Sequence, residues 1–182
     1  PGDAVSELVR VGVIDSSGRF LPDDQVKERR PDLAERLVER AGERHFLLAT
    51  EDESGGDEVV LTQRDVRELQ FAKAAISTGW RLLLEAFGAE EADVQQVLLA
   101  GSFGTYLSPS SAVRIGLVPK LPVLRIVSAG NVAGEGAKMV LLSLPERHGA
   151  QALLDEIHYV ELSDHEGFQD RFVGELAFPM PS

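Results

Sequence analysis

Cysteine is absent from the sequence and basic residues are scarce, and each shortage excludes a class of protein. Without cysteine the chain cannot form a disulfide framework, a thiolate metal site, a Cys-ligated iron–sulfur cluster or a cysteine nucleophile. Its 182 residues include 18 Lys and Arg against 30 Asp and Glu, so the formal net charge is −12. Nucleic acids and anionic membranes both require dense positive charge. We therefore expect neither a nucleic-acid partner nor a membrane partner.

Long hydrophobic runs are also absent. No apolar stretch approaches the roughly 20 residues of a membrane span, and the start at Pro1 is not a signal peptide. A cytoplasmic location is therefore expected. The first residue is not Met, and it leads directly into an amphipathic pattern over residues 4–11. This favours a piece of a longer protein; removal of Met or of a tag is the alternative.

The spacing of apolar residues and turn signals predicts alternating helices and strands, which is typical of an α/β layered domain with a partly parallel sheet. Helices are expected at 3–12, after Pro31 to near Gly42, at 62–87, 110–116, 146–157 and 164–176, and after the glycine-rich stretch 130–137 to Leu144. Strands are expected at 45–50, 58–61, 94–100, 124–128 and 158–162, with the acidic stretch 51–58 as a hairpin loop.

The strongest single prediction is the helix that Thr62 opens. Thr62 and Asp65 have the spacing of a capping box. Apolar residues then recur at helical intervals until Gly88, which predicts the end of the helix. About 25 residues at roughly 1.5 Å each give a helix near 38 Å long, which must cross the whole domain.

Two junctions between a strand and a glycine-rich turn are candidate ligand sites. The first is Gly101-Ser102-Phe103-Gly104, which follows the strand 94–100. Glycine allows a ring or a phosphate to approach the main chain, and open α/β folds bind ligands at the carboxyl ends of their strands. The motif has neither P-loop nor dinucleotide-binding spacing.

The second junction contains Gly130, Asn131, Gly134 and Gly136 at the start of a predicted helix. The unpaired amides and partial positive charge of a helix N-terminus suit an anion. Glycines that only permit tight strand–helix packing are the alternative explanation for both junctions.

No pattern of catalytic or metal-binding residues is found. The four histidines include no His-x-x-x-His pair, and no Gly-x-Ser-x-Gly elbow occurs. The five carboxylates of residues 51–58 lack the spacing of a calcium loop. The sequence therefore predicts neither a catalytic residue nor a metal site in this chain.

A set of motifs, taken in order, resembles one known family. They are Leu99–Leu107, Ser110–Pro119, Gly130–Met139, Phe168–Phe172 with Phe178-Pro179, and the N-terminal stretch Asp3–Phe20. Together they are similar to the C-terminal domain of the ATP-dependent reductive activators of corrinoid proteins. The resemblance covers nearly the whole chain and is weakest across residues 21–44.

This resemblance implies a fold and a parent protein. The family belongs to the actin, sugar-kinase and heat-shock-chaperone ATPase superfamily, which implies an α/β, ribonuclease-H-like lobe with a mixed sheet and flanking helices. Residues 1–182 would be a single C-terminal lobe, with inserted helices and a hairpin at 13–92 and the α/β core at 93–182. A plant-type ferredoxin domain with a two-iron two-sulfur cluster, a linker and a first ATPase lobe would precede it in the parent.

The resemblance also implies an activity. The parent would bind ATP or ADP with Mg and would use ATP to let an electron pass uphill to the cobalt(II) corrinoid of a partner protein in a methyltransferase system, restoring cobalt(I). This chain would be the nucleotide-binding lobe and not a complete enzyme. The alternative is a protein-interaction or homodimerisation module that docks the corrinoid protein, as the acids of residues 146–170 and the apolar Phe168, Phe172 and Phe178 suggest. A stand-alone sugar or acyl kinase would need both lobes in one chain.

Individual site residues follow from the same superfamily. Gly101, Ser102, Phe103 and Gly104 match the adenosine motif under the adenine. Polar residues at intervals of 0, 3, 4 and 7 on the long helix correspond to Gln70, Lys73, Ala74 and Ser77, and Ser110 stands where an acid is often found. Ala74 lacks the cation that would stack on the base, which predicts weak adenine affinity. The alternative to nucleotide binding is that the polar residues of the long helix only form a stripe exposed to solvent.

Overall fold

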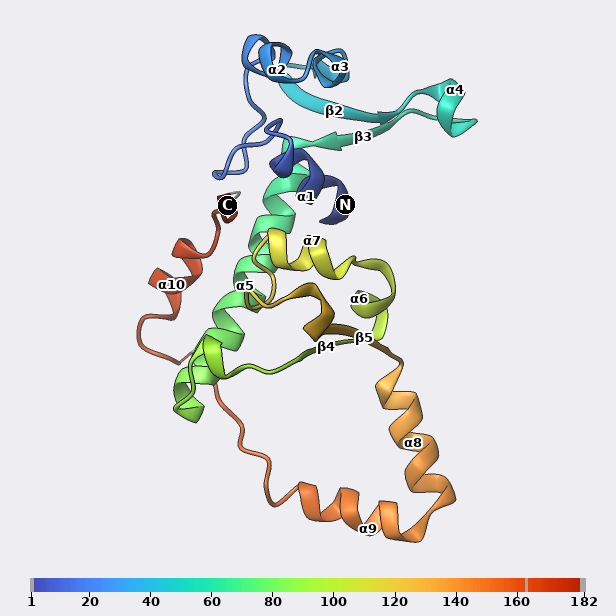
Figure 1. Cartoon of the computed structure of the whole chain (residues 1–182), viewed down its shortest axis with the longest axis vertical. Coiled ribbons are helices and arrows are strands. Elements are labelled where there is room, and N and C mark those ends of the chain that lie inside the picture. The colour runs from blue at the N-terminus through green and yellow to red at the C-terminus, as the bar shows by residue number, and fades with distance from the viewer. Residues whose placement is uncertain (1, 163, 181–182) are drawn as a thin grey trace.

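The computed structural model describes residues 2–162 and 164–180, apart from the side chains of Ser102 and Phe103 (Figure 1). Its α-helices are α1 Gly2–Arg10, α2 Asp23–Arg29, α3 Pro31–Ala34, α4 Glu51–Ser54, α5 Gln63–Phe87, α6 Gly101–Tyr106, α7 Pro109–Arg114, α8 Val132–Leu142, α9 Leu144–Leu153 and α10 Phe168–Gly174. Its strands are β1 Leu37–Arg40, β2 Glu43–Ala49, β3 Val59–Thr62, β4 Val97–Ala100 and β5 Ile126–Gly130. Among these residues, no helix is both long and apolar enough to cross a membrane.

Helix α5 runs through the middle of the molecule and connects its upper and lower parts (Figure 1). The predicted capping box is confirmed. Thr62 Oγ1 accepts a hydrogen bond from the Asp65 amide at 3.0 Å, and Asp65 Oδ2 accepts one from the Thr62 amide at 2.8 Å. Gly88 ends the helix in the left-handed conformation, with φ of 72°. The sequence therefore predicted both ends of α5 correctly.

The upper part contains the antiparallel sheet β1-β2-β3. The predicted helix from Pro31 to near Gly42 is wrong, because α3 ends at Ala34 and β1 follows. Ala41 and Gly42 both have positive φ, at 52° and 79°, as a type I′ hairpin turn requires. Leu37 of β1 is opposite Phe46 of β2 and is buried. Burial of Leu37 in the core therefore outweighed the helical pattern of the surrounding charges.

The lower part contains β4 and β5, which pair in parallel. Both were predicted, and the structure shortens the first by three residues and shifts the second by two. The predicted strand at 158–162 is wrong, since no described strand pairs with that segment. Tyr159 is 83% exposed and Val160 and Leu162 are half-buried, so the segment makes side-chain contacts without pairing as a strand. The acidic loop between β2 and β3 contains the single turn α4, which has a capping box of its own.

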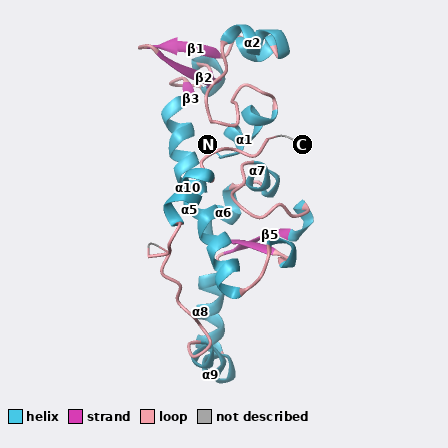
Figure 2. Ribbon diagram, turned by 90° about the vertical axis from the view of Figure 1, so that its left-hand side faces the viewer, coloured by secondary structure: helices cyan, strands magenta, loops and turns pink. Residues whose placement is uncertain are grey.

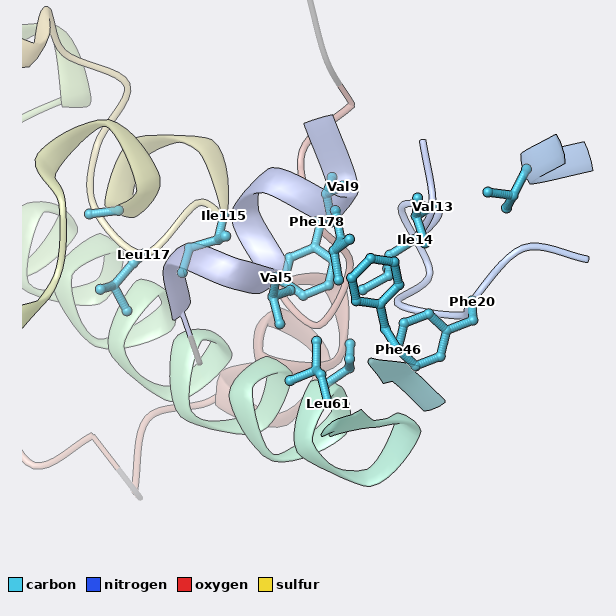
Figure 3. Packing of buried hydrophobic residues seen from close by; sticks show 14 of the residues in the cluster. Val5, Val9, Val13, Ile14, Phe20, Phe46, Leu61, Ile115, Leu117 and Phe178 are labelled. Carbon is cyan, nitrogen blue, oxygen red and sulfur yellow. The ribbon is translucent and has the colours of Figure 1, made fainter. Parts of the chain in front are cut away.

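The hydrophobic core lies around α1, between the antiparallel sheet and the first turns of α5 (Figure 3), and it extends to Leu99 of β4 and Ile126 of β5. It joins segments that are distant in sequence, since Val5 in α1, Phe46 in β2, Ile115 after α7 and Phe178 near the C-terminus all belong to it. The predicted α/β class with flanking helices is confirmed, and parallel and antiparallel pairing occur in two separate sheets. The predicted boundary between residues 92 and 93 stays a prediction.

Helices α8 and α9 project away from this core as an arm (Figures 1 and 2). We call residues Val132–Leu153 the α8–α9 arm. Neither helix has a buried residue. Its exposed large apolar side chains are Val132, Met139, Leu141, Leu142, Leu144 and Leu153. The arm is therefore held mainly by its connection to β5 and by contacts between its own two helices.

Candidate functional site

The two glycine-rich junctions lie side by side. Ala100 of β4 is opposite Gly130 of β5 in the parallel register, so Gly101 and Gly130 occupy the same edge of the sheet. Both have positive φ, at 67° and 64°, a conformation that glycine adopts without steric cost. The structure therefore brings together the two junctions that the sequence singled out, at the carboxyl ends of parallel strands.

The first junction is a helix start. Helix α6 begins at Gly101, and a Cβ atom at Gly104 would collide with the carbonyl oxygen of Leu99. Ser128 Oγ of β5 donates a hydrogen bond to the Gly104 carbonyl. Gly104 is therefore explained by close packing of α6 on the sheet. The side chains of Ser102 and Phe103 lie outside the described residues, so the adenosine role of this motif stays a prediction.

The second junction caps α8. Asn131 Oδ1 accepts a hydrogen bond from the Gly134 amide at 3.0 Å, and a Cβ atom at Gly134 would press against the Asn131 side chain. Gly136 faces open space. Asn131 and Gly134 thus have a structural role in the cap, and the anion-binding role of this junction stays a prediction.

The polar residues predicted on α5 are inside the molecule. Gln70, Lys73 and Ser77 are each at most 2% exposed. Gln70 Nε2 donates to the Leu176 carbonyl at 2.7 Å, and Lys73 Nζ donates to the Ala177 carbonyl at 2.8 Å. We call residues 175–180 the C-terminal segment. It accepts hydrogen bonds from two of the three side chains that were predicted to hold a nucleotide or to form a solvated stripe, whereas Ser77 Oγ donates to the Ala74 carbonyl of its own helix at 3.3 Å.

The solvated-stripe alternative is therefore wrong for these three residues. Sequence reasoning also missed the C-terminal segment as the partner of Gln70 and Lys73, because contacts between residues about 105 positions apart have no local pattern. The one available signal was polar side chains at intervals of three and four, next to the apolar positions of the same helix. A nucleotide-binding role for Gln70, Lys73 and Ser77 stays a prediction.

Burial sets the protonation behaviour of Lys73. Desolvation lowers the pKa of its ammonium group, and the carboxylate of Glu175, 3.8 Å from Nζ, acts in the opposite direction. Glu175 also pairs with Arg81 Nε at 2.9 Å. Lys73 is thus a cation held inside the fold by one carbonyl and a shared carboxylate.

Lys73 also lines a cavity of about 320 Å³, which we call the α5–α6 cavity. The other lining residues are Gly2, Asp3, Leu69, Ala72, Ile76, Tyr106, Leu107, Ile115 and Leu117. On α5, the lining residues Leu69, Ala72 and Ile76 each come one position before a residue of the predicted polar stripe. Lys73 belongs both to the lining and to that stripe. Gln70 and Ser77 are not among the lining residues. The cavity is therefore mostly apolar with one buried cation.

Ser110 is separated from that cavity. It lies on α7, where its hydroxyl is 2.8 Å from Ser108 Oγ, and it lines a second cavity of about 640 Å³. The predicted site residues therefore fall into three places: the sheet edge, the buried stripe of α5 and the second cavity. Within residues 2–162 and 164–180, no group of three His, Asp or Glu residues could hold a metal ion.

Comparison with known proteins shows the family. Residues 3–182 match the family described as the C-terminal domain of RACo, the ASKHA domain. The corrinoid activation enzyme RamQ of Eubacterium limosum is 34% identical over 177 residues, which is 97% of this chain and 30% of RamQ. A solved structure of a reductive activator for a corrinoid, iron–sulfur protein superposes with a TM-score of 0.83 and 31% identity, over 98% of this chain and 27% of the other.

The chain therefore belongs to the RACo C-terminal ASKHA-domain family. The resemblance and the fold expected from the sequence are both confirmed. The chain spans about 30% of the length of RamQ, so activities of a whole activator are proposals for this chain.

Proposed function

We propose that the chain is the nucleotide-binding lobe of an ATP-dependent reductive activator that restores cobalt(II) corrinoid proteins to cobalt(I). The α5–α6 cavity is the observation that carries this proposal. It places a buried cation, Lys73, beside the segment that follows Gly101, in a family whose relatives are named for corrinoid activation.

The cavity suits the base and sugar of a nucleotide. Ligand pockets usually have roughly 300–1,000 Å³ and are mainly apolar, with a few polar groups that fix orientation. Here Ile76, Tyr106 and Leu107 offer apolar surface. The Lys73 ammonium is buried and donates to the Ala177 carbonyl, so it would contribute positive charge beside a bound sugar or phosphate.

Other parts of the reaction are expected outside this chain. Its described residues provide no carboxylate cluster for Mg, and with no cysteine it cannot ligate a plant-type iron–sulfur cluster. The triphosphate grip, Mg and the cluster would therefore belong to the preceding parts of the parent. ATP supplies the free energy for electron transfer to the corrinoid, and this lobe would bind and orient its nucleoside.

Calorimetry with ATP and ADP tests the proposal, on this chain and on the full-length parent. For the chain alone we expect binding weaker than submicromolar, because the phosphate contacts lie elsewhere. Ile76→Glu places a carboxylate in the apolar cavity and should weaken binding by the parent at least about tenfold, which is roughly 1.4 kcal/mol. Leu83→Glu, on the same helix but outside the cavity, is the matched control and should bind normally.

Two results would contradict this function. One is equal nucleotide affinity of the Ile76→Glu variant and the wild-type parent, which would show that the nucleotide does not bind in the α5–α6 cavity. The other is corrinoid reduction by the parent with no ATP hydrolysis, which would remove the activation role.

The exposed arm favours a second candidate function, a docking or dimerisation module. Leu141, Leu142 and Leu144 are 64–83% exposed, and side chains of this kind mark interaction surfaces when they are contiguous. Leu142→Asp should then lower affinity for the corrinoid protein or abolish self-association, measured by analytical ultracentrifugation. Unchanged values for both would exclude this function for the arm.

A further inference from the structure

A second cavity lies across the loop 115–118 from the α5–α6 cavity. Ile115 and Leu117 face the α5–α6 cavity, whereas Gly116 and Val118 line the other one, which has a volume of about 640 Å³. Four of its thirteen lining residues are Lys or Arg, although only 18 of 182 are in the whole chain. These are Arg10, Arg81, Arg114 and Lys120, and we call the cavity the basic cleft.

Carboxylates near the basic cleft hold these cations without neutralising them. Glu175 and Glu91 both pair with Arg81, at 2.9 and 3.3 Å. Glu7, just outside, pairs with Arg10 and Arg114. Three carboxylates thus face four cations, and buried Lys73 adds a fifth next to Glu175. The cleft is therefore positive in a chain whose net charge is −12.

Several donors around the cleft are free to bind. Arg10 is 53% exposed and pairs with Glu7 only through Nε, and its two terminal nitrogens have no hydrogen-bond acceptor among residues 2–162 and 164–180. Lys120 is exposed, and its side chain makes no ion pair with any residue of that described part. A cleft with fixed cations and open donors raises the local concentration of anionic groups.

The floor of the cleft is apolar. Val113, Val118 and Pro179 line it, and Val123 and Met180 are 47% and 80% exposed beside them. A small inorganic anion would use the cations and leave this apolar surface in water. A polypeptide segment with alternating carboxylates and apolar side chains would use both.

We propose that the basic cleft is the docking site for an acidic, amphipathic segment of a partner polypeptide. Its carboxylates bind Arg10 and Lys120 at the rim, and its apolar side chains pack on Val123 and Met180. The basic cleft and the α5–α6 cavity share no lining residue, so the docking proposal stands even if nucleotide does not bind in the α5–α6 cavity.

Fluorescence anisotropy tests the proposal with a fluorescein-labelled eight-residue peptide of alternating Glu and Leu. The 182-residue chain should bind it saturably, and affinity should fall at least about tenfold between 50 and 300 mM NaCl, because salt screens exposed charges. Lys120→Glu should weaken binding at least about fivefold and Arg10→Gln about threefold, since rim charges contribute modestly. Lys27→Glu on α2 is the matched control, an exposed lysine outside the cleft, and should change affinity less than twofold.

Each alternative occupant has its own result. Equal weakening by Lys27→Glu and Lys120→Glu would show attraction to net charge only and would overturn the proposal. So would full displacement of the peptide by an equimolar amount of inorganic pyrophosphate, which would identify a small-anion site. Self-association of the unliganded chain that Lys120→Glu abolishes would identify a second copy as the occupant. An absence of saturable peptide binding would also refute the site.

Discussion

The packed upper part and the α8–α9 arm both contain many apolar side chains, but the upper part buries them and the arm exposes them. In the upper part, α1 alone buries Val5, Leu8 and Val9. In the arm, α8 has an apolar composition and buries no residue. A helix in a protein gains most of its stability from packing of an apolar face, so the arm lacks what stabilises the rest. The exposed apolar side chains of the arm are the reason for proposing it as a docking surface.

The largest expected effect tests whether the C-terminal segment belongs to the packed part. Phe178 is 2% exposed and contacts the core (Figure 3), and its amide donates to the Ser16 carbonyl at 2.8 Å. Phe178→Ala should lower the free energy of unfolding by about 3–5 kcal/mol, the usual cost of a large cavity in a core. Urea denaturation measures it.

The matched control for that substitution is Phe87→Ala at the end of α5, where the ring is 87% exposed. It should change the free energy of unfolding by less than about 0.5 kcal/mol. Equal effects of the two variants would mean that the C-terminal segment is not anchored.

The second prediction concerns pH and the buried Lys73. Its pKa in the folded state lies below the ordinary value of 10.5, so between these two pKa values the unfolded chain binds more protons than the folded chain. Stability conferred by this residue therefore rises as the pH rises through that window. The native chain should gain free energy of unfolding relative to Lys73→Met between pH 7 and pH 10, measured in urea at each pH.

Other titrating groups cancel in that difference, and Lys27→Met, at an exposed position, supplies the baseline. A difference that stays constant with pH, or that falls as the pH rises, would show that Lys73 is not desolvated. The Lys73 ammonium group would then be hydrated like the exposed lysines of the molecule.

A smaller effect is expected at the start of α5. Thr62→Ala removes the side-chain acceptor for the Asp65 amide and should cost about 1 kcal/mol of unfolding free energy, as N-cap substitutions typically do. Thr50→Ala removes the same contact from α4, a single exposed turn, and should cost less than half as much. Equal losses would mean that α5 contributes no more to stability than an isolated turn.

The smallest effect is expected in the arm. Leu142 is 83% exposed, so Leu142→Gln should change the unfolding free energy of this chain by no more than about 0.5 kcal/mol. The same substitution at Leu82, which is fully buried in α5, should cost several times as much because it buries an amide in the core. In the full-length parent, a large loss from Leu142→Gln would show that the arm is covered there.

Local patterns predicted much of the fold. Thr62, Asp65 and Gly88 defined α5, and the apolar run before Gly101 defined β4, because capping and periodicity depend on neighbours within a few residues. The hairpin at Ala41 and Gly42 was mistaken for a helix. The choice there depended on Leu37 reaching Phe46 and the core, a contact that the local charge pattern conceals.

For the candidate site, the sequence by itself determined the family, the absence of any thiolate chemistry, and the two glycine junctions, whereas the register of β4 and β5 decided that these junctions share one sheet edge. Tertiary structure alone decided that Gln70 and Lys73 bind the C-terminal segment, that Lys73 faces the α5–α6 cavity, and that cations from α1, α5 and α7 share one cleft. The reason is physical: glycine conformations and helix caps are local properties, whereas burial of a cation and convergence of distant charges exist only once remote segments pack together.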